Sequence, residues 1–177
     1  SPAVEQIKKL VQEVDSGQEV APERRAALLE TFEQYECWGP YFRLLKRCID
    51  NPATRQLSDY VRLSRVQNLY LEDVFAAAET SAAMVAELKL SYQRFSEEVL
   101  PQVMEFEDFA AEATILSAVC DRLPSPADHV ACLERLCMLY EKKTHNETQL
   151  GKIYEKLLSI DPRNVRSEEH TSELQSH

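Results

Sequence analysis

The amino-acid sequence predicts an all-α protein built from stacked antiparallel helix hairpins, an α-solenoid. The chain has only 3 glycines in 177 residues, which leaves almost none for β-hairpin turns or phosphate-cradling loops. Apolar residues recur at helical spacing along the chain, and no segment shows the alternation typical of a strand. Helix starts recur about every 18 residues, so helix pairs recur about every 36, as in helix-turn-helix repeats. The alternative is a compact helical bundle, which usually has longer helices and less regular turns.

Proline, glycine and apolar stripes divide the first part of the chain into expected helices. Gly17 stands where the first helix should stop, and Pro22 suits the first turn of the second. We expect a turn at Trp38-Gly39-Pro40. Asn51 precedes a proline and should end the third helix, because the residue before proline is pushed out of helical geometry. The apolar stripes cover 4–14, 28–35, 41–49 and 57–64.

In the second part of the chain, the clearest pattern is a stripe of small apolar residues over 74–88. Such a stripe lets another helix approach closely and predicts a central helix. Pro101 should either kink the helix in which it lies or start a new one. Residues 125–128 have the composition of a capping box, and Asn146 can cap the last helix. The remaining apolar stripes cover 91–99, 109–120, 133–140 and 150–158.

The charge of the chain bears on its partners. The chain has 30 acidic and 20 basic residues, which gives a net charge of −10, and it shows no basic face. Nucleic-acid binding depends largely on Lys and Arg, so we expect no nucleic-acid partner. Charged residues interrupt every hydrophobic run well before the ~20 apolar residues of a bilayer span, so we expect no membrane span.

The cysteines indicate a reducing compartment. Their number is odd, no C-x-x-C pair occurs, and most lie on apolar stripes, which favours buried thiols in a cytoplasmic protein. They are Cys37, Cys48, Cys120, Cys132 and Cys137. His129 and Cys132 lie one helical turn apart and could share a zinc ion. Cys137 points elsewhere, so we expect core thiols and a surface histidine rather than a metal site.

The sequence also lacks the residue patterns typical of a catalytic site. A cysteine nucleophile needs a base, an orienting group and an oxyanion site, and no glycine-rich turn is present to supply the last of these. The densest acidic cluster, Glu105, Glu107, Asp108 and Glu112, could form a carboxylate pair or a divalent-ion site. We expect instead charge at a helix junction, with Asp108 and Glu112 stabilising a helix N-terminus. The sequence therefore predicts neither a cofactor nor an enzyme.

The last helix pair resembles a tetratricopeptide repeat. The first helix of the pair matches the family at Leu133, Leu136, Cys137 and Tyr140, and the second at Tyr154 and Pro162. Leu150 and Leu157 stand where the family prefers alanine, so the copy is degenerate. The hairpins over 22–51 and 53–89 resemble the family only in the spacing of their helices. The aromatic residues Phe32, Tyr35 and Trp38 keep open the half-a-tetratricopeptide class, whose members scaffold RNA-processing assemblies.

This resemblance implies a concave groove lined by the first helix of each pair. Mapped onto this chain, the groove residues are Ser58, Arg62, Arg65, Glu134, Met138, Glu141 and Lys142. Arg62 and Arg65 suit a peptide carboxylate, although arginines on a solvated helix face are the alternative. The family's paired Lys and Asn that clamp a carboxylate are not complete here.

The resemblance therefore implies a non-catalytic scaffold that binds a peptide or a partner helix. One alternative is a helical regulatory or recruiting segment of a larger enzyme. A third is a structural fragment whose apolar faces are exposed because neighbouring repeats are missing, which predicts self-association.

The two ends of the chain suggest a piece of a longer reading frame. The chain begins at Ser1-Pro2 without methionine. Residues 166–177 carry no apolar stripe, and their sequence resembles the in-frame translation of a common sequencing adapter. We therefore expect residues 1–165 to be a truncated helical-repeat array and residues 166–177 to be a non-native tail.

Overall fold

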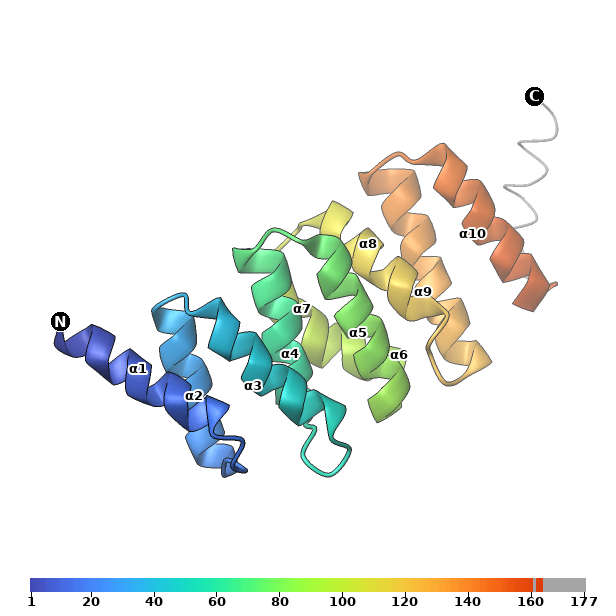
Figure 1. The fold of residues 1–177 in the computed structure, drawn as a ribbon. Helices are drawn as coiled ribbons and strands as arrows, with labels where there is room; N and C mark the ends of the chain where they lie inside the picture. Colours follow the sequence, from blue (N-terminus) through green and yellow to red (C-terminus); the bar gives the residue numbers. More distant parts are fainter. Residues whose placement is uncertain (161, 164–177) are drawn as a thin grey trace. The chain divides into compact units, whose positions relative to one another are not determined.

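The computed structural model describes residues 1–160, 162 and 163, and within this range it shows helices and turns but no strand. The predicted all-α class is confirmed. Several helices that follow one another in the chain pack as antiparallel hairpins, among them Pro22–Gln34 with Trp38–Asp50 and Pro126–Met138 with Glu147–Ile160 (Figure 1). The α-helices are α1 (Pro2–Asp15), α2 (Pro22–Gln34), α3 (Trp38–Asp50), α4 (Leu57–Arg65), α5 (Val74–Leu88), α6 (Tyr92–Arg94), α7 (Leu100–Val103), α8 (Phe109–Cys120), α9 (Pro126–Met138) and α10 (Glu147–Ile160). There are also three π-helical turns among the described residues: η1 (Val66–Tyr70) continues α4, η2 (Phe95–Val99) links α6 to α7, and η3 (Leu139–Lys143) continues α9.

The described part of the chain forms two compact units, the first over Ser1–Asp59 and the second from Tyr60 onwards. In the first unit, α3 packs against both α1 and α2. The buried side chains at its centre are Val14, Leu28, Leu29, Phe32, Tyr41, Leu44 and Leu45. Arg24 on α2 holds Glu13 on α1 through Nε and Nη2, at 2.8 and 2.6 Å. This bond lowers the pKa of Glu13 and ties α1 to the α2–α3 hairpin.

The predicted turn at Trp38-Gly39-Pro40 is wrong, because α3 begins at Trp38. The first four N–H groups of a helix have no partner within the helix, so a proline at the third position costs no hydrogen bond. The Trp38 ring lies against the rings of Tyr41 and Phe42, at centroid distances of 5.4 and 6.3 Å. Contacts between side chains three and four residues apart favour helical geometry from Trp38 onwards.

The second unit is organised around α5 and α8, which pack closely against each other. Small buried side chains make this approach possible, namely Ala77, Ala78, Ser81, Ala82, Ala111 and Ala113. The Ser64 hydroxyl contacts the Ala77 carbonyl at 3.2 Å and the Ser81 hydroxyl at 3.1 Å, which joins α4 to α5. The prediction that 74–88 forms a central helix is confirmed for this unit.

Pro101 lies near the start of α7, directly after η2, and the backbone is helical on both sides of it, so it does not separate two helices. Residues 92–103 are helical throughout, and η2 precedes α7, which contains the proline. The Leu100 N–H donates to the Phe95 carbonyl, five residues earlier. In a regular helix, the ring of Pro101 would clash with the carbonyl group four residues earlier. The wider π turn lies at this point, and it explains why the helix continues through the proline.

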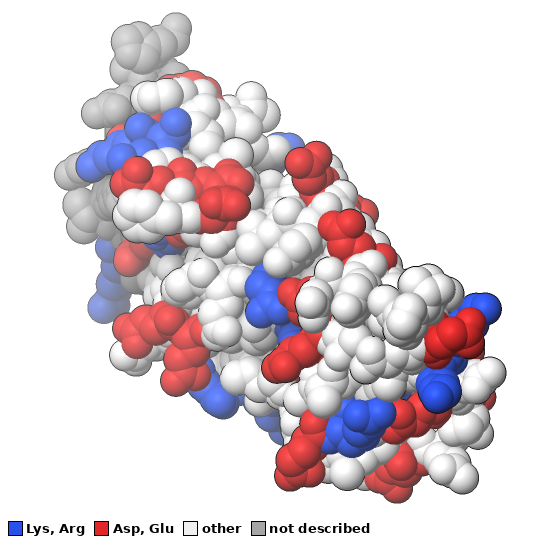
Figure 2. All heavy atoms as spheres, turned by 90° about the vertical axis from the view of Figure 1, so that its left-hand side faces the viewer, with Lys and Arg blue, Asp and Glu red and all other residues white. Residues whose placement is uncertain are grey.

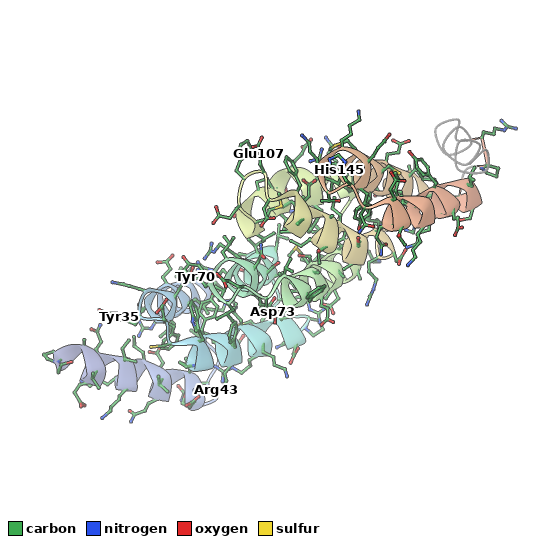
Figure 3. All side chains as sticks on the ribbon, turned by 90° about the horizontal axis from the view of Figure 1, so that it is seen from above. Tyr35, Arg43, Tyr70, Asp73, Glu107 and His145 are labelled. Carbon is green, nitrogen blue, oxygen red and sulfur yellow. The ribbon has the colours of Figure 1, made fainter. Side chains whose placement is uncertain are left out.

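Three turns of the second unit repeat one geometry, and Figure 3 looks onto them from above, with Tyr70, Asp73, Glu107 and His145 labelled. In each turn, one residue with positive φ precedes the N-cap of the next helix: Glu72 (53°), Glu107 (60°) and His145 (52°). The N-cap side chain then accepts the N–H three residues further on, at Asp73, Asp108 and Asn146. These caps lie 35 and 38 residues apart, close to the helix-pair period of the sequence. The caps expected at Asp108, at Asn146 and at Ser125, which accepts the Asp128 N–H at 3.1 Å, are confirmed.

Charge is mixed on the face in Figure 2, where basic side chains lie scattered among acidic and uncharged ones and form no continuous patch. Across the described residues, every helix is too short or too polar to cross a bilayer.

Candidate functional site

The residues predicted to line a groove lie on α4, α9 and η3. On α4, Ser58 is exposed and the arginines Arg62 and Arg65 are half-buried. On α9 and η3, Met138 is half-buried, and Glu134, Glu141 and Lys142 are exposed. None of the seven residues lines the three pockets described below. Their role in binding stays a prediction.

A pocket of about 370 Å³ lies within the second unit, on the side of α7 and α9. Its walls come from η2, α7, the loop that leads into α8, the start of α8, and α9. The lining residues are Ser96, Leu100, Pro101, Met104, Glu105, Phe106, Glu107, Phe109, Glu112 and Arg135. We call this the α7–α9 pocket. Its walls are mainly apolar, and its polar groups sit at two places, inside the pocket and along the loop.

The inner polar group is an ion pair between Glu112 on α8 and Arg135 on α9. Arg135 donates from Nε and Nη2 to the two Glu112 oxygens, at 2.6 and 2.8 Å. Glu112 is only 5% exposed, whereas the Arg135 side chain is 36% exposed. The hydrogen bond with Glu112 raises the pKa of Arg135 and keeps the guanidinium charged and fixed in orientation.

The sequence places Glu112 at a helix N-terminus but does not predict its pair with Arg135. Glu112 does lie in the first turn of α8, but Arg135 binds both of its carboxylate oxygens. The two residues are 23 apart on different helices, and no helical spacing rule links them. A lone acidic residue inside the otherwise apolar 109–120 stripe was the available signal, because such a residue needs a partner when buried.

Tyr92 on α6 interacts electrostatically with both members of the ion pair. Burial raises the pKa of its phenol to about 12, and the nearby Glu112 carboxylate acts in the same direction. The phenol therefore keeps its proton at neutral pH and cannot act as a base there. Glu112, Arg135 and Tyr92 together form a charge-balanced group in a mostly apolar setting.

The outer polar groups lie on the loop at the mouth of the pocket. Phe106 is 92% exposed, and the acidic residues Glu105 and Glu107 flank it and are exposed as well. Asp108 caps α8 through the Ala111 N–H at 3.1 Å, as predicted. Lys143 lies over the Phe109 ring, with Nζ 4.8 Å from the ring centroid. A nearly fully exposed aromatic ring beside an apolar hollow is the most unusual feature of this surface.

The histidine and cysteines considered for zinc have other contacts. A ring nitrogen of His129 lies 2.8 Å from the Leu123 carbonyl, and the Cys132 thiol points at the Leu116 carbonyl. Cys132 is also hydrogen-bonded to Cys120, and this bond together with burial raises the pKa of the Cys132 thiol. All five cysteines are free thiols, and four of them are buried. The described part of the chain holds no group of three or more side chains suited to a metal ion.

Two further pockets lie one in each unit. The pocket in the first unit has a volume of about 220 Å³ and is lined in part by Arg25, Arg47 and Cys48. Arg25 is paired there with the buried Asp59, at 3.5 Å. The other, in the second unit, is a shallow groove of about 610 Å³ over α5 and α8. Alanine, serine and threonine side chains line most of it, and the ring of Phe75, 73% exposed, stands at its edge.

Comparisons of the chain with protein-family models, with curated proteins and with solved structures found no match.

Proposed function

We propose that this chain is a non-catalytic protein-interaction module that binds a peptide segment in the α7–α9 pocket. One observation carries the proposal: the Phe106 ring is 92% exposed at the mouth of an apolar pocket. Exposed aromatic side chains next to apolar hollows are typical anchors of protein interfaces. Repeated helix hairpins support such a site, because their packed seam keeps the surface residues in fixed positions.

The ion pair inside the pocket and the Tyr92 phenol that interacts with it favour binding over catalysis. Both Glu112 oxygens accept hydrogen bonds from Arg135, so this carboxylate already serves as one half of an ion pair between α8 and α9. The Tyr92 phenol has a pKa of about 12 and stays protonated at neutral pH. General acid–base catalysis works best with a pKa near the working pH, which the Tyr92 phenol does not offer.

A peptide library displayed on phage tests the proposal. The library is selected against the whole chain, and the enriched peptides are then measured against Phe106→Ala by fluorescence polarisation. We expect peptides whose affinity falls at least about ten-fold in Phe106→Ala, as for an interface anchor. Phe75→Ala is the matched control, because it removes an exposed ring outside the pocket. If no enriched peptide distinguishes Phe106→Ala from Phe75→Ala, the proposal is wrong.

A further inference from the structure

We infer that the α7–α9 pocket takes a large apolar side chain of a peptide that carries a basic residue within two positions of that side chain. This inference rests on the proposed function and specifies the partner. It follows from three features of the pocket: its apolar walls, the charge along its mouth, and the state of Arg135.

The apolar walls of the pocket indicate which side chain of the peptide it can bind. Leu100, Pro101, Met104, Phe106 and Phe109 offer apolar surface in a space of about 370 Å³. Transfer of apolar surface out of water is favourable in proportion to its area. A leucine, methionine or aromatic side chain uses these walls best. The mobile thioether of Met104 can adapt to its shape.

The charge at the mouth of the pocket indicates which residues should flank the apolar side chain of the peptide. Glu105 and Glu107 stand on the two sides of Phe106 in sequence, and both are exposed. Asp108 next to them adds a third negative charge while it caps α8. Among the described lining residues Arg135 is the basic one, and Glu112 pairs with it, while Lys143 lies over the Phe109 ring. The mouth is therefore negative overall, and it attracts a Lys or Arg of the partner and repels an acidic flank.

Arg135 indicates which peptide group can hydrogen-bond inside the pocket. Its Nε and Nη2 bind Glu112, and in the described part of the chain its Nη1 group has no acceptor. A guanidinium whose charge is already matched gains little from a second carboxylate, but it can still donate to a neutral carbonyl. Arg135 therefore suits a main-chain carbonyl of the peptide, and the pocket does not select a free carboxyl terminus.

The library selection tests this inference separately from the proposed function. Among peptides that depend on Phe106, we expect Lys or Arg within two positions of the central apolar residue and few acidic residues there. Phe106-dependent peptides without a basic flank would overturn the inference and leave the proposed function standing. Absence of Phe106-dependent peptides would overturn both.

A charge-neutral variant provides the second readout. For a selected peptide with a basic flank, the double substitution Glu105→Gln and Glu107→Gln should weaken binding about five-fold, as expected for two exposed ion pairs. The same peptide with its basic residues changed to serine should bind the double variant and the native chain equally. Raising the salt from 0.05 to 0.5 M should remove most of the difference.

The matched control is the double substitution Glu72→Gln and Glu79→Gln, which changes the net charge equally at residues outside the pocket. If this control weakens binding as much as the Glu105 and Glu107 variant does, the effect is one of net charge and the inference is wrong. Sedimentation of the chain without peptide tests whether a second copy of the chain occupies the pocket instead. A dimer that Phe106→Asp converts to a monomer would mean that a second copy of the chain covers the pocket, and it would also overturn the inference.

Discussion

Glu112 is a buried carboxylate whose charge is matched by one partner on the neighbouring helix. Removing one member of such a pair leaves the other uncompensated, which costs more than the pair itself contributes. We expect Arg135→Ala to lower the free energy of unfolding by about 2 kcal/mol, a figure reduced from the fully buried case because Arg135 is partly exposed.

Urea unfolding of this variant and of a double variant without either charge measures this effect. The variant that combines Glu112→Leu with Arg135→Met should be more stable than Arg135→Ala alone, because no charge is left buried. The exposed ion pair of Arg94 and Glu98 is the control, and Arg94→Ala should change stability by less than about 0.5 kcal/mol. Equal losses for Arg94→Ala and Arg135→Ala would contradict the role given to burial.

Tyr92 predicts a loss of stability at high pH. Its pKa is raised in the folded chain to about 12 from an ordinary value of 10. A group that binds its proton more tightly when folded stabilises the fold at pH values below its ordinary pKa. That stabilisation should decline as the pH rises from 10 to 12, and Tyr92→Phe should reduce the decline. Absorbance of tyrosinate, compared between the native chain and Tyr92→Phe, should show the late titration directly.

The repeated turns predict how the helices of the second unit are stabilised. Asp73 and Asp108 each accept an N–H of the first helical turn, so Asp73→Ala or Asp108→Ala should cost about 1 kcal/mol. Glu72 has a φ of 53°, where a side chain is strained and glycine is not. Glu72→Gly should therefore leave stability unchanged or raise it by up to about 1 kcal/mol. Thermal unfolding of the three variants checks both expectations, and a clear loss in Glu72→Gly would contradict the second.

The helices themselves were predictable from the sequence because their signals are local. Apolar stripes, caps and proline positions depend on residues within four positions of one another, and they located the helices correctly apart from the start of α3. The π turns were not predictable. At η1 and η3 the residue after the turn donates five positions back, in Leu71 to Val66 and Thr144 to Leu139, and this wider bonding has no composition signal.

The candidate site was less predictable than the helices because it depends on contacts between helices. The sequence indicated an acidic cluster at 105–112, but it did not indicate that Arg135 would reach Glu112 or that Phe106 would remain exposed. The groove residues inferred from the family resemblance fall outside the pocket, although Met138 lies one turn beyond Arg135 on α9. Helical periodicity shows which residues share a face, but not which faces enclose a hollow.

For the whole chain, charge predicts one behaviour that separates protein binding from nucleic-acid binding. The net charge is −10, and basic side chains are scattered on the face shown in Figure 2. Affinity for a phosphate backbone comes mainly from clustered Lys and Arg that release counterions, and this chain repels such a backbone instead. We therefore expect no binding to a 30-base-pair DNA duplex or to a 30-nucleotide poly(U) RNA, even at 0.05 M salt, where electrostatic attraction is strongest.

An electrophoretic mobility assay at micromolar concentrations of the chain measures this directly. A shifted band whose intensity falls as salt rises from 0.05 to 0.2 M would contradict the expectation, because such dependence is the signature of phosphate contacts. The same chain should still bind the basic peptides selected through Phe106, since the acidic mouth that repels a phosphate backbone attracts their Lys and Arg residues. The absence of binding to polyanions and the salt-sensitive binding of basic peptides follow from one charge distribution and are expected together.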